Sequence, residues 1–183
     1  MGRKDYCRIA ALMEGSMMIY KVTDDSGFLG IINPDLYQSF VDENWEFDQL
    51  FAHFKMEIKK KNLLLWGTGC EGIWKVEVRN EISKEKGMRQ FEGFIKVTQE
   101  MLCLINYESL TMAAQFSDVK LPEKHQQDLN IIMRNGLYRC RIVQLFNPED
   151  MSKKGIAYDF LVEFAKVLTG ENNWEHIAWY ENL

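Results

Sequence analysis

The chain has 183 residues, the length of one ordinary domain, and its 46% hydrophobic content can fill a core without disulfide or metal staples. Its net charge of −5 argues against a surface that coats nucleic acid, since such a surface needs a basic stripe. No apolar run approaches the roughly 18 to 20 residues that span a bilayer, and the first residues lack the pattern of a signal peptide. We expect a cytoplasmic protein with a single globular domain over residues 14–183, after a disordered leader or mis-assigned start over residues 1–13.

The first predicted elements are two strands over residues 17–22 and 28–32. The Thr-Asp-Asp-Ser-Gly sequence between them has the residue types that turns require, so Asp24 and Asp25 are assigned to a turn rather than to an acid–base pair. An amphipathic helix is predicted next, over about residues 46–61, because apolar side chains recur there with helical spacing. Acidic residues at the start of this helix and lysines at its end complement the helix dipole.

Residues 67–72 read Gly-Thr-Gly-Cys-Glu-Gly, a formal match to the Gly-x-Gly-x-x-Gly dinucleotide-binding fingerprint. In that motif a helix starts at the glycines, and its free N–H groups hold the pyrophosphate. Here Trp74, Val76 and Val78 instead alternate with polar residues, which is typical of a half-buried strand. We therefore predict a β-hairpin. A small-molecule or nucleotide-binding enzyme that uses the turn from Gly67 to Gly72 is the alternative hypothesis.

Further strands are predicted over residues 91–97, 102–107, 128–134 and 137–146. Asn135-Gly136 separates the last two and is a strong hairpin signal, because both positions tolerate a positive φ. Residues 156–168 suit either a strand or a helix by periodicity, and their β-branched and aromatic content favours a strand. A last short strand is predicted over residues 174–180. The expected fold is α+β and mostly antiparallel β, with sandwich-like sheets and one main helix.

No residue pattern indicates catalysis, a cofactor or a metal. His53, His125 and His176 lie far apart in the sequence, and the four cysteines form no Cys-x-x-Cys pair, which indicates reduced thiols. Cys70 lies in the glycine-rich turn, where backbone N–H groups could form an oxyanion hole. It has no local base, and the adjacent Glu71 would raise its thiol pKa, so a structural cysteine is favoured.

The charge distribution points to a protein partner. Residues 14–57 hold nine acidic residues against two lysines, a local balance of −7. This excess favours an electronegative face that recognises a basic protein, although a solvated helix cap would give the same pattern. The C-terminal segment combines aromatic anchors with acids and is the second candidate interface. The predicted partner-binding residues are Asp42, Glu43, Glu46, Asp48, Trp174, Glu175, Trp179 and Glu181.

Several stretches resemble those of small, uncharacterised bacterial cytosolic proteins, over nearly all of the chain from Met18. They are Gly-Phe-Leu-Gly (27–30), Trp-Gly-Thr-Gly (66–69), Asn-Tyr-Glu-Ser-Leu-Thr-Met-Ala-Ala-Gln-Phe (106–116), Leu-Pro-Glu-Lys-His (121–125) and Asn-Gly-Leu-Tyr-Arg (135–139). In general character the chain is also similar to bacterial immunity proteins, which bind and block a cognate toxin. This resemblance implies a non-enzymatic inhibitor of a basic toxin such as a nuclease. A structural subunit of a larger assembly remains a further alternative.

Overall fold

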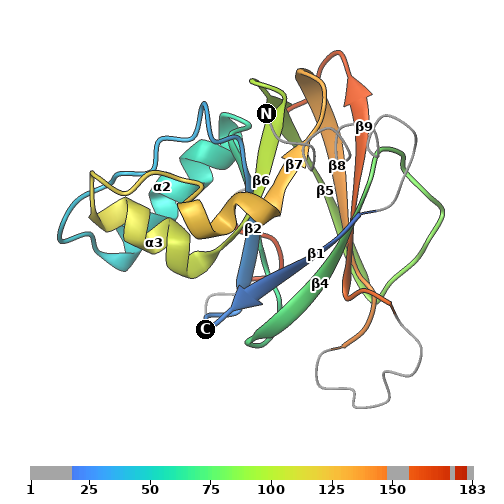
Figure 1. Cartoon of the computed structure of the whole chain (residues 1–183), viewed down its shortest axis with the longest axis horizontal. Coiled ribbons are helices and arrows are strands. Elements are labelled where there is room, and N and C mark those ends of the chain that lie inside the picture. Colours follow the sequence, from blue (N-terminus) through green and yellow to red (C-terminus); the bar gives the residue numbers. More distant parts are fainter. Residues whose placement is uncertain (1–17, 148–156, 174–175, 181–183) are drawn as a thin grey trace.

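The computed structural model describes residues 18–147, 157–173 and 176–180, so the predicted leader over residues 1–13 lies outside the described residues. The strands of the described residues form two sheets, and the two helices of this part of the chain lie together on one side of the molecule (Figure 1). The five-stranded sheet has the order β1 (Met18–Asp24), β4 (Gly72–Arg79), β9 (Phe160–Val167), β8 (Gly136–Gln144) and β5 (Arg89–Val97). Its neighbouring strands are antiparallel except for β4 and β9, which are parallel.

The four-stranded sheet has the order β3 (Leu63–Gly67), β2 (Phe28–Ile32), β6 (Met101–Asn106) and β7 (Asn130–Ile132), all antiparallel. One face packs on the five-stranded sheet and the other on the helices, so all five residues of β3 are buried. Leu64 and Trp66 belong to the core between the sheets, while Leu63 and Leu65 belong to the core beneath the helices. The predicted α+β, mostly antiparallel sandwich is confirmed.

The predicted long helix is confirmed as α2 (Phe47–Lys59), which buries Leu50, Phe54 and Ile58 against the four-stranded sheet. Its start is held by a capping box, in which Glu46 and Gln49 each accept a backbone N–H of the other. A second helix, α3 (Tyr107–Gln115), was not predicted. It is short, and its clearest start signal is Asn106, whose side chain accepts the Ser109 N–H. A 3₁₀ turn, η1 (Lys124–Leu129), leads into β7.

Both predicted hairpins are wrong, although the strands that flank them are present. The glycine segment connects β3 to β4, and Asn135-Gly136 connects β7 to β8, but in each case the two strands belong to different sheets. Turn residues predict that the chain changes direction, and they do not determine whether the flanking strands exchange hydrogen bonds. The turn between β1 and β2 is likewise a crossing between sheets.

The uncertain segment at residues 156–168 contains strand β9, as favoured, with Phe160, Val162 and Phe164 in the core between the sheets. The last predicted strand, over residues 174–180, is not formed as predicted. Within its described part, residues 176–180, only Ala178 forms an isolated bridge, which pairs it with Trp66 beside the edge strand β3. None of the helices that the structure describes is long and apolar enough to cross a membrane.

Candidate protein-binding surface

The start of α2 presents four exposed carboxylates: Asp42, Glu43, Glu46 and Asp48. We call these four residues the acidic surface. Glu46 caps the helix, and Asp42 accepts the backbone N–H of Asn44 at 2.8 Å, so local hydrogen bonds fix two of the four. Within the described residues none of the four forms a salt bridge. Their negative charge is therefore directed to solvent and is available to a basic partner.

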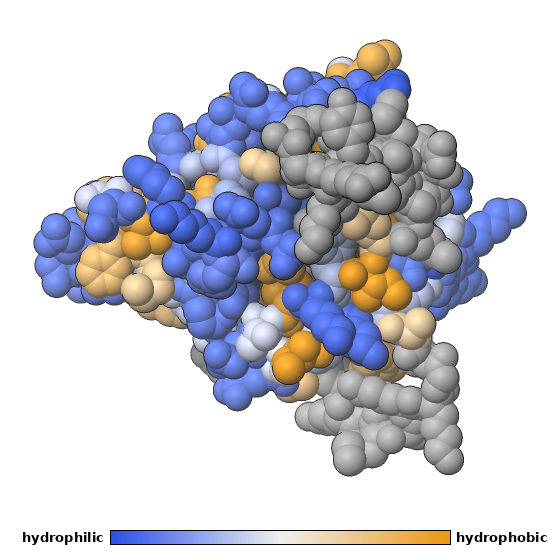
Figure 2. Space-filling view, viewed as in Figure 1, coloured by the Kyte–Doolittle hydropathy of each residue, from blue (hydrophilic) through white to orange (hydrophobic). Residues whose placement is uncertain are grey.

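A groove of about 550 Å³ lies beside the acidic surface and joins the two regions that the sequence singled out. One side is the first half of α2, including Phe47, Asp48 and Phe51, and the other is the C-terminal segment, including Ile177 and Tyr180. We call it the aromatic groove. In the view of Figure 2, polar residues dominate the part of the molecule that carries the helices, and apolar residues show between them as separate patches.

Stacked rings build the aromatic groove. The Phe47 and Phe51 ring centroids are 4.1 Å apart with an interplanar angle of 29°, and the Tyr180 centroid lies 5.2 Å from that of Phe51. Behind them Phe28 contacts Tyr180 at 5.0 Å and stacks on Tyr107 at 5.3 Å. Phe47 remains 47% exposed, although its neighbours on the helix stripe are buried. An exposed large ring beside a groove is a feature of binding surfaces.

Trp179, which the sequence predicted as a partner anchor, is held by contacts within the chain. The Arg89 guanidinium carbon lies 4.3 Å from the centroid of its ring, and Phe91 meets it edge to face at 5.0 Å. Trp179 packs against the core between the sheets, whereas Tyr180 turns to the aromatic groove. The role of Trp179 in partner binding stays a prediction. The other three predicted residues of the C-terminal segment, Trp174, Glu175 and Glu181, lie outside the described residues. Tyr180 was not among the predicted binding residues, although its position in the aromatic C-terminal segment could have indicated it.

The glycine segment has no helix after it, because β4 begins at Gly72. A Cβ on Gly67 would lie 2.7 Å from the Trp179 carbonyl oxygen, so the first glycine is needed for close approach of the C-terminal segment. Gly69 has a φ of +94°, which favours glycine. The Thr68 carbonyl accepts from Gln144, and the Thr68 hydroxyl lies 2.9 Å from Asp24 Oδ2. The segment is thus an internal junction of the fold.

Asp24 is the centre of that junction and is fully buried. Its Oδ1 accepts the backbone N–H groups of Ser26 and Phe28, and its Oδ2 accepts the Thr68 hydroxyl and the Trp74 indole N–H, at distances of 2.9–3.2 Å. The neighbouring Asp25 is exposed. Of the two residues assigned to the turn, Asp25 lies in it, whereas Asp24 ends β1 and its side chain holds the turn through the N–H groups of Ser26 and Phe28. Asp24 also links this turn to the glycine segment between β3 and β4.

Two of the three described cysteines, Cys103 and Cys140, are buried. Burial raises the pKa of the Cys103 thiol to about 12 and raises that of Cys140 well above its usual range, which makes both poor nucleophiles. Cys70 is exposed in the crossing between β3 and β4. Over the residues that the structure describes, no group of three or more His, Cys, Asp or Glu side chains could hold a metal ion.

The outer face of the five-stranded sheet carries buried charges that the sequence did not reveal. Glu163 lies opposite Arg79 on β4 and Arg141 on β8, and its Oε2 is 2.6 Å from Arg141 Nη1. The backbone N–H of Ser83 donates to Glu163 Oε1 at 2.9 Å, which fastens the connection from β4 to β5 over this face. We call Glu77, Arg79, Glu85, Arg141 and Glu163 the ionic network.

The alternation in β4 predicts Glu77 on the solvent side of the strand, opposite Trp74, Val76 and Val78. In the structure the β4–β5 connection covers that side, and Glu77 is only 2% exposed. Hydrogen bonds from Tyr158 and Arg79 lower the pKa of Glu85, so it stays ionised beside its arginines. Each charge in the ionic network lies beside an opposite charge, so we assign the network to holding the fold together and not to binding a ligand.

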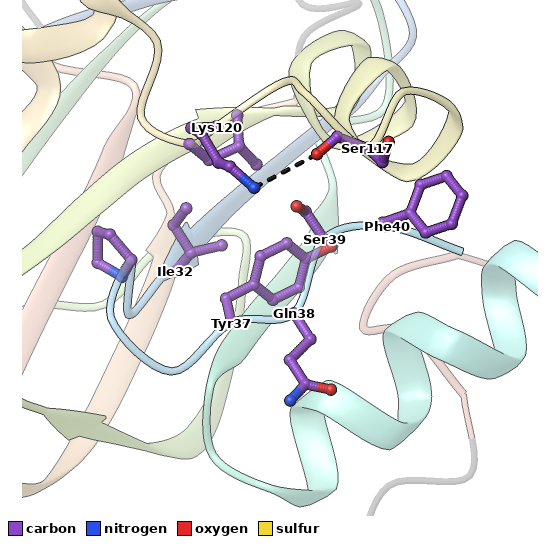
Figure 3. Close-up of a pocket in the computed structure, with 9 residues that line it drawn as sticks. Ile32, Tyr37, Gln38, Ser39, Phe40, Ser117 and Lys120 are labelled. Carbon is purple, nitrogen blue, oxygen red and sulfur yellow. Dashed lines mark hydrogen bonds between the residues drawn. The ribbon is translucent and has the colours of Figure 1, made fainter. Parts of the chain in front are cut away.

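A second, smaller pocket of about 270 Å³ lies between the loop after β2 and the loop after α3 (Figure 3). Tyr37, Ser39 and Lys120 line it, and the Lys120 ammonium donates to the Ser117 carbonyl at 3.3 Å. The Tyr37 hydroxyl is buried without a hydrogen-bond partner among the described residues, and burial raises its pKa. This pocket lies outside the acidic surface and carries none of the predicted binding residues.

No protein-family model matches the chain, and no curated protein matches its sequence. Two solved structures share its fold. "Crocagin biosynthetic gene J" matches with a TM-score of 0.52 and 11% identity, over 82% of this chain and 95% of that protein. ComJ from Bacillus subtilis, described as an inhibitor of the DNA-degrading activity of NucA, matches with a TM-score of 0.50 and 11% identity, over 82% of this chain and 96% of its own.

Proposed function

We propose that the chain is a non-enzymatic immunity or inhibitor protein that binds and neutralises a basic toxin, such as a nuclease. The observation that carries the proposal is the acidic surface beside the aromatic groove. Exposed carboxylates without salt-bridge partners in the described structure would speed encounter with a basic protein, and partly exposed rings would hold the complex once formed. The likeness in fold to ComJ supports an inhibitory role.

The geometry of the glycine segment argues against the alternative of a nucleotide-binding enzyme at this turn. A phosphate cradle at the glycine segment would need the N–H groups of a helix start, and strand β4 follows instead. Gly67 is explained by the C-terminal segment, and Thr68 by the Asp24 junction. A structural subunit would show the same acidic surface, but it would block no activity of its partner. Inhibition of the partner therefore separates the inhibitor hypothesis from the structural-subunit hypothesis.

The test is to produce the chain together with the protein encoded by the adjacent gene and to measure complex formation and residual activity. We expect a stoichiometric complex, weakened by salt, in which the toxic or DNA-degrading activity is lost. A complex that keeps its full activity would support the structural-subunit hypothesis. A chain that stays monomeric and does not protect cells from that protein would remove the proposal.

A further inference from the structure

The aromatic groove holds a specific combination of rings and charge. Asp48 follows Phe47 directly, at the end of the groove where the acidic surface begins. The partly exposed Phe47 ring and Tyr180 both line the groove, and each lies against Phe51, with centroid distances of 4.1 and 5.2 Å. A cation over the face of an aromatic ring is attracted by the ring quadrupole, and a carboxylate nearby adds a hydrogen-bonding partner.

A second carboxylate lies behind the same rings. Glu108 is in the first turn of α3, next to Tyr107, and Tyr107 stacks on the Phe28 ring that contacts Tyr180. Both carboxylate oxygens of Glu108 are buried, and neither has a hydrogen-bond partner in the described part of the chain. Glu108 therefore adds a second acidic group near the rings.

The opposite end of the groove differs. Lys55 lies two helical turns after Asp48, and His176 lies on the C-terminal segment, so both basic groups line the groove. Lys55 disfavours a second cation at that end. The electrostatic potential therefore differs between the two ends of the groove, which is negative at Asp48 and positive at Lys55.

We infer that the aromatic groove receives an arginine or lysine side chain of the partner, with its cation over Phe47 and Tyr180 and paired with Asp48. This inference rests on the proposed function, because it names the group of the basic partner that the surface recognises. An arginine fits best, since its planar guanidinium stacks on rings and binds a carboxylate through two N–H groups.

The test uses the full chain and two synthetic peptides of equal length, hexa-arginine and hexa-citrulline. Titration calorimetry gives the affinity, and NMR follows the ring signals of Phe47 and Tyr180. We expect hexa-arginine to bind and to shift both ring signals, and the neutral hexa-citrulline to do neither. Phe47→Leu should weaken binding about two- to fivefold, and Asp48→Asn about tenfold.

Asp118→Asn is the matched control, because Asp118 is an equally exposed acid outside the groove, and its affinity should stay within about twofold of the original. Circular dichroism checks that each variant is folded. The inference is overturned if hexa-arginine leaves the ring signals unchanged, or if Phe47→Leu and Asp48→Asn bind like Asp118→Asn.

This result is separate from the fate of the proposed function. A cognate toxin that is inhibited equally by the original chain and by Phe47→Leu would leave the proposed function standing and remove the inference. Groove-dependent binding of hexa-arginine, without any inhibited partner, would support the inference and remove the proposed function.

Discussion

The ionic network and the acidic surface both consist of charged residues, but the charges are largely buried and paired in the first and exposed in the second. On the outer face of the five-stranded sheet, Arg141 and Glu163 are almost completely buried and lie within 2.6 Å of each other. At the start of α2 the carboxylates are exposed and make no salt bridge in the described structure. Charges of the first kind hold the fold together, and charges of the second kind are free to act on another molecule.

The largest effect is expected at the centre of the ionic network. Arg141→Ala would leave Glu163 buried beside fewer partners and would also free the Ser83 and Glu85 carbonyl oxygens. We expect a loss of about 3–5 kcal/mol in the free energy of unfolding, measured with urea. The double variant Arg141→Met with Glu163→Leu should recover part of this loss. A change in Arg141→Ala below about 1 kcal/mol would contradict the structural role.

The adjacent residues Asp24 and Asp25 give a matched pair for the same comparison. Asp24→Ala removes the acceptor of four hydrogen bonds at the junction between the sheets, and should lower the free energy of unfolding by about 2–4 kcal/mol. Asp25→Ala removes an exposed carboxylate and should change it by less than about 0.5 kcal/mol. Thermal and urea unfolding of the two variants measure the difference, and equal losses would refute the distinction.

Gly67 and Gly72, the first and last glycines of the motif, differ in how closely other atoms approach them. Gly67→Ala would bring its Cβ to 2.7 Å from the Trp179 carbonyl, so we expect a loss of about 1–3 kcal/mol in stability and weaker partner binding. At Gly72 the nearest atom would be 3.8 Å away, and Gly72→Ala should change stability by less than about 1 kcal/mol. Urea unfolding of both variants is the measurement, and similar losses would show that close packing at Gly67 is unimportant.

The smallest effect on stability is expected at the acidic surface. Neutralising Asp42 and Glu43 to Asn and Gln should change the free energy of unfolding by less than about 0.5 kcal/mol, because both side chains are exposed. The same change should slow association with a basic partner severalfold at low salt and have less effect at high salt. Stopped-flow association rates at two salt concentrations measure this, and an unchanged rate would argue against electrostatic steering.

The sequence was most informative where local pattern and packing agree. The apolar stripe and charged ends predicted α2 correctly, and the alternation through Trp74 and Val76 predicted β4. The hairpins failed because turn residues such as Asn135-Gly136 are equally suited to crossings between sheets, and pairing depends on contacts far apart in the sequence. The ionic network was missed for the same reason, since Arg79, Arg141 and Glu163 come from three separate strands.

Both regions of the candidate site are predictions from the sequence, which gave no sign that they lie close together. The acidic start of α2 and the aromatic tail are about 130 residues apart in the chain, and the isolated bridge from Ala178 to Trp66 is what carries the tail alongside α2. The side chains of the neighbouring residues Trp179 and Tyr180 point in different directions. Trp179 packs against the core between the sheets, and Tyr180 lines the groove. Side-chain direction at an irregular segment follows no period that a sequence could reveal.

The most direct test of the account is the inhibition of the cognate basic protein by two charge-matched variants. The first neutralises the acidic surface at Asp42, Glu43, Glu46 and Asp48, and the second neutralises four exposed acids elsewhere: Glu71, Glu81, Glu100 and Asp118. Both remove four negative charges, so net charge alone cannot separate them. We predict that the first loses most of its inhibition while the second keeps it. Equal inhibition by the two variants would contradict the role of the acidic surface in binding the toxin.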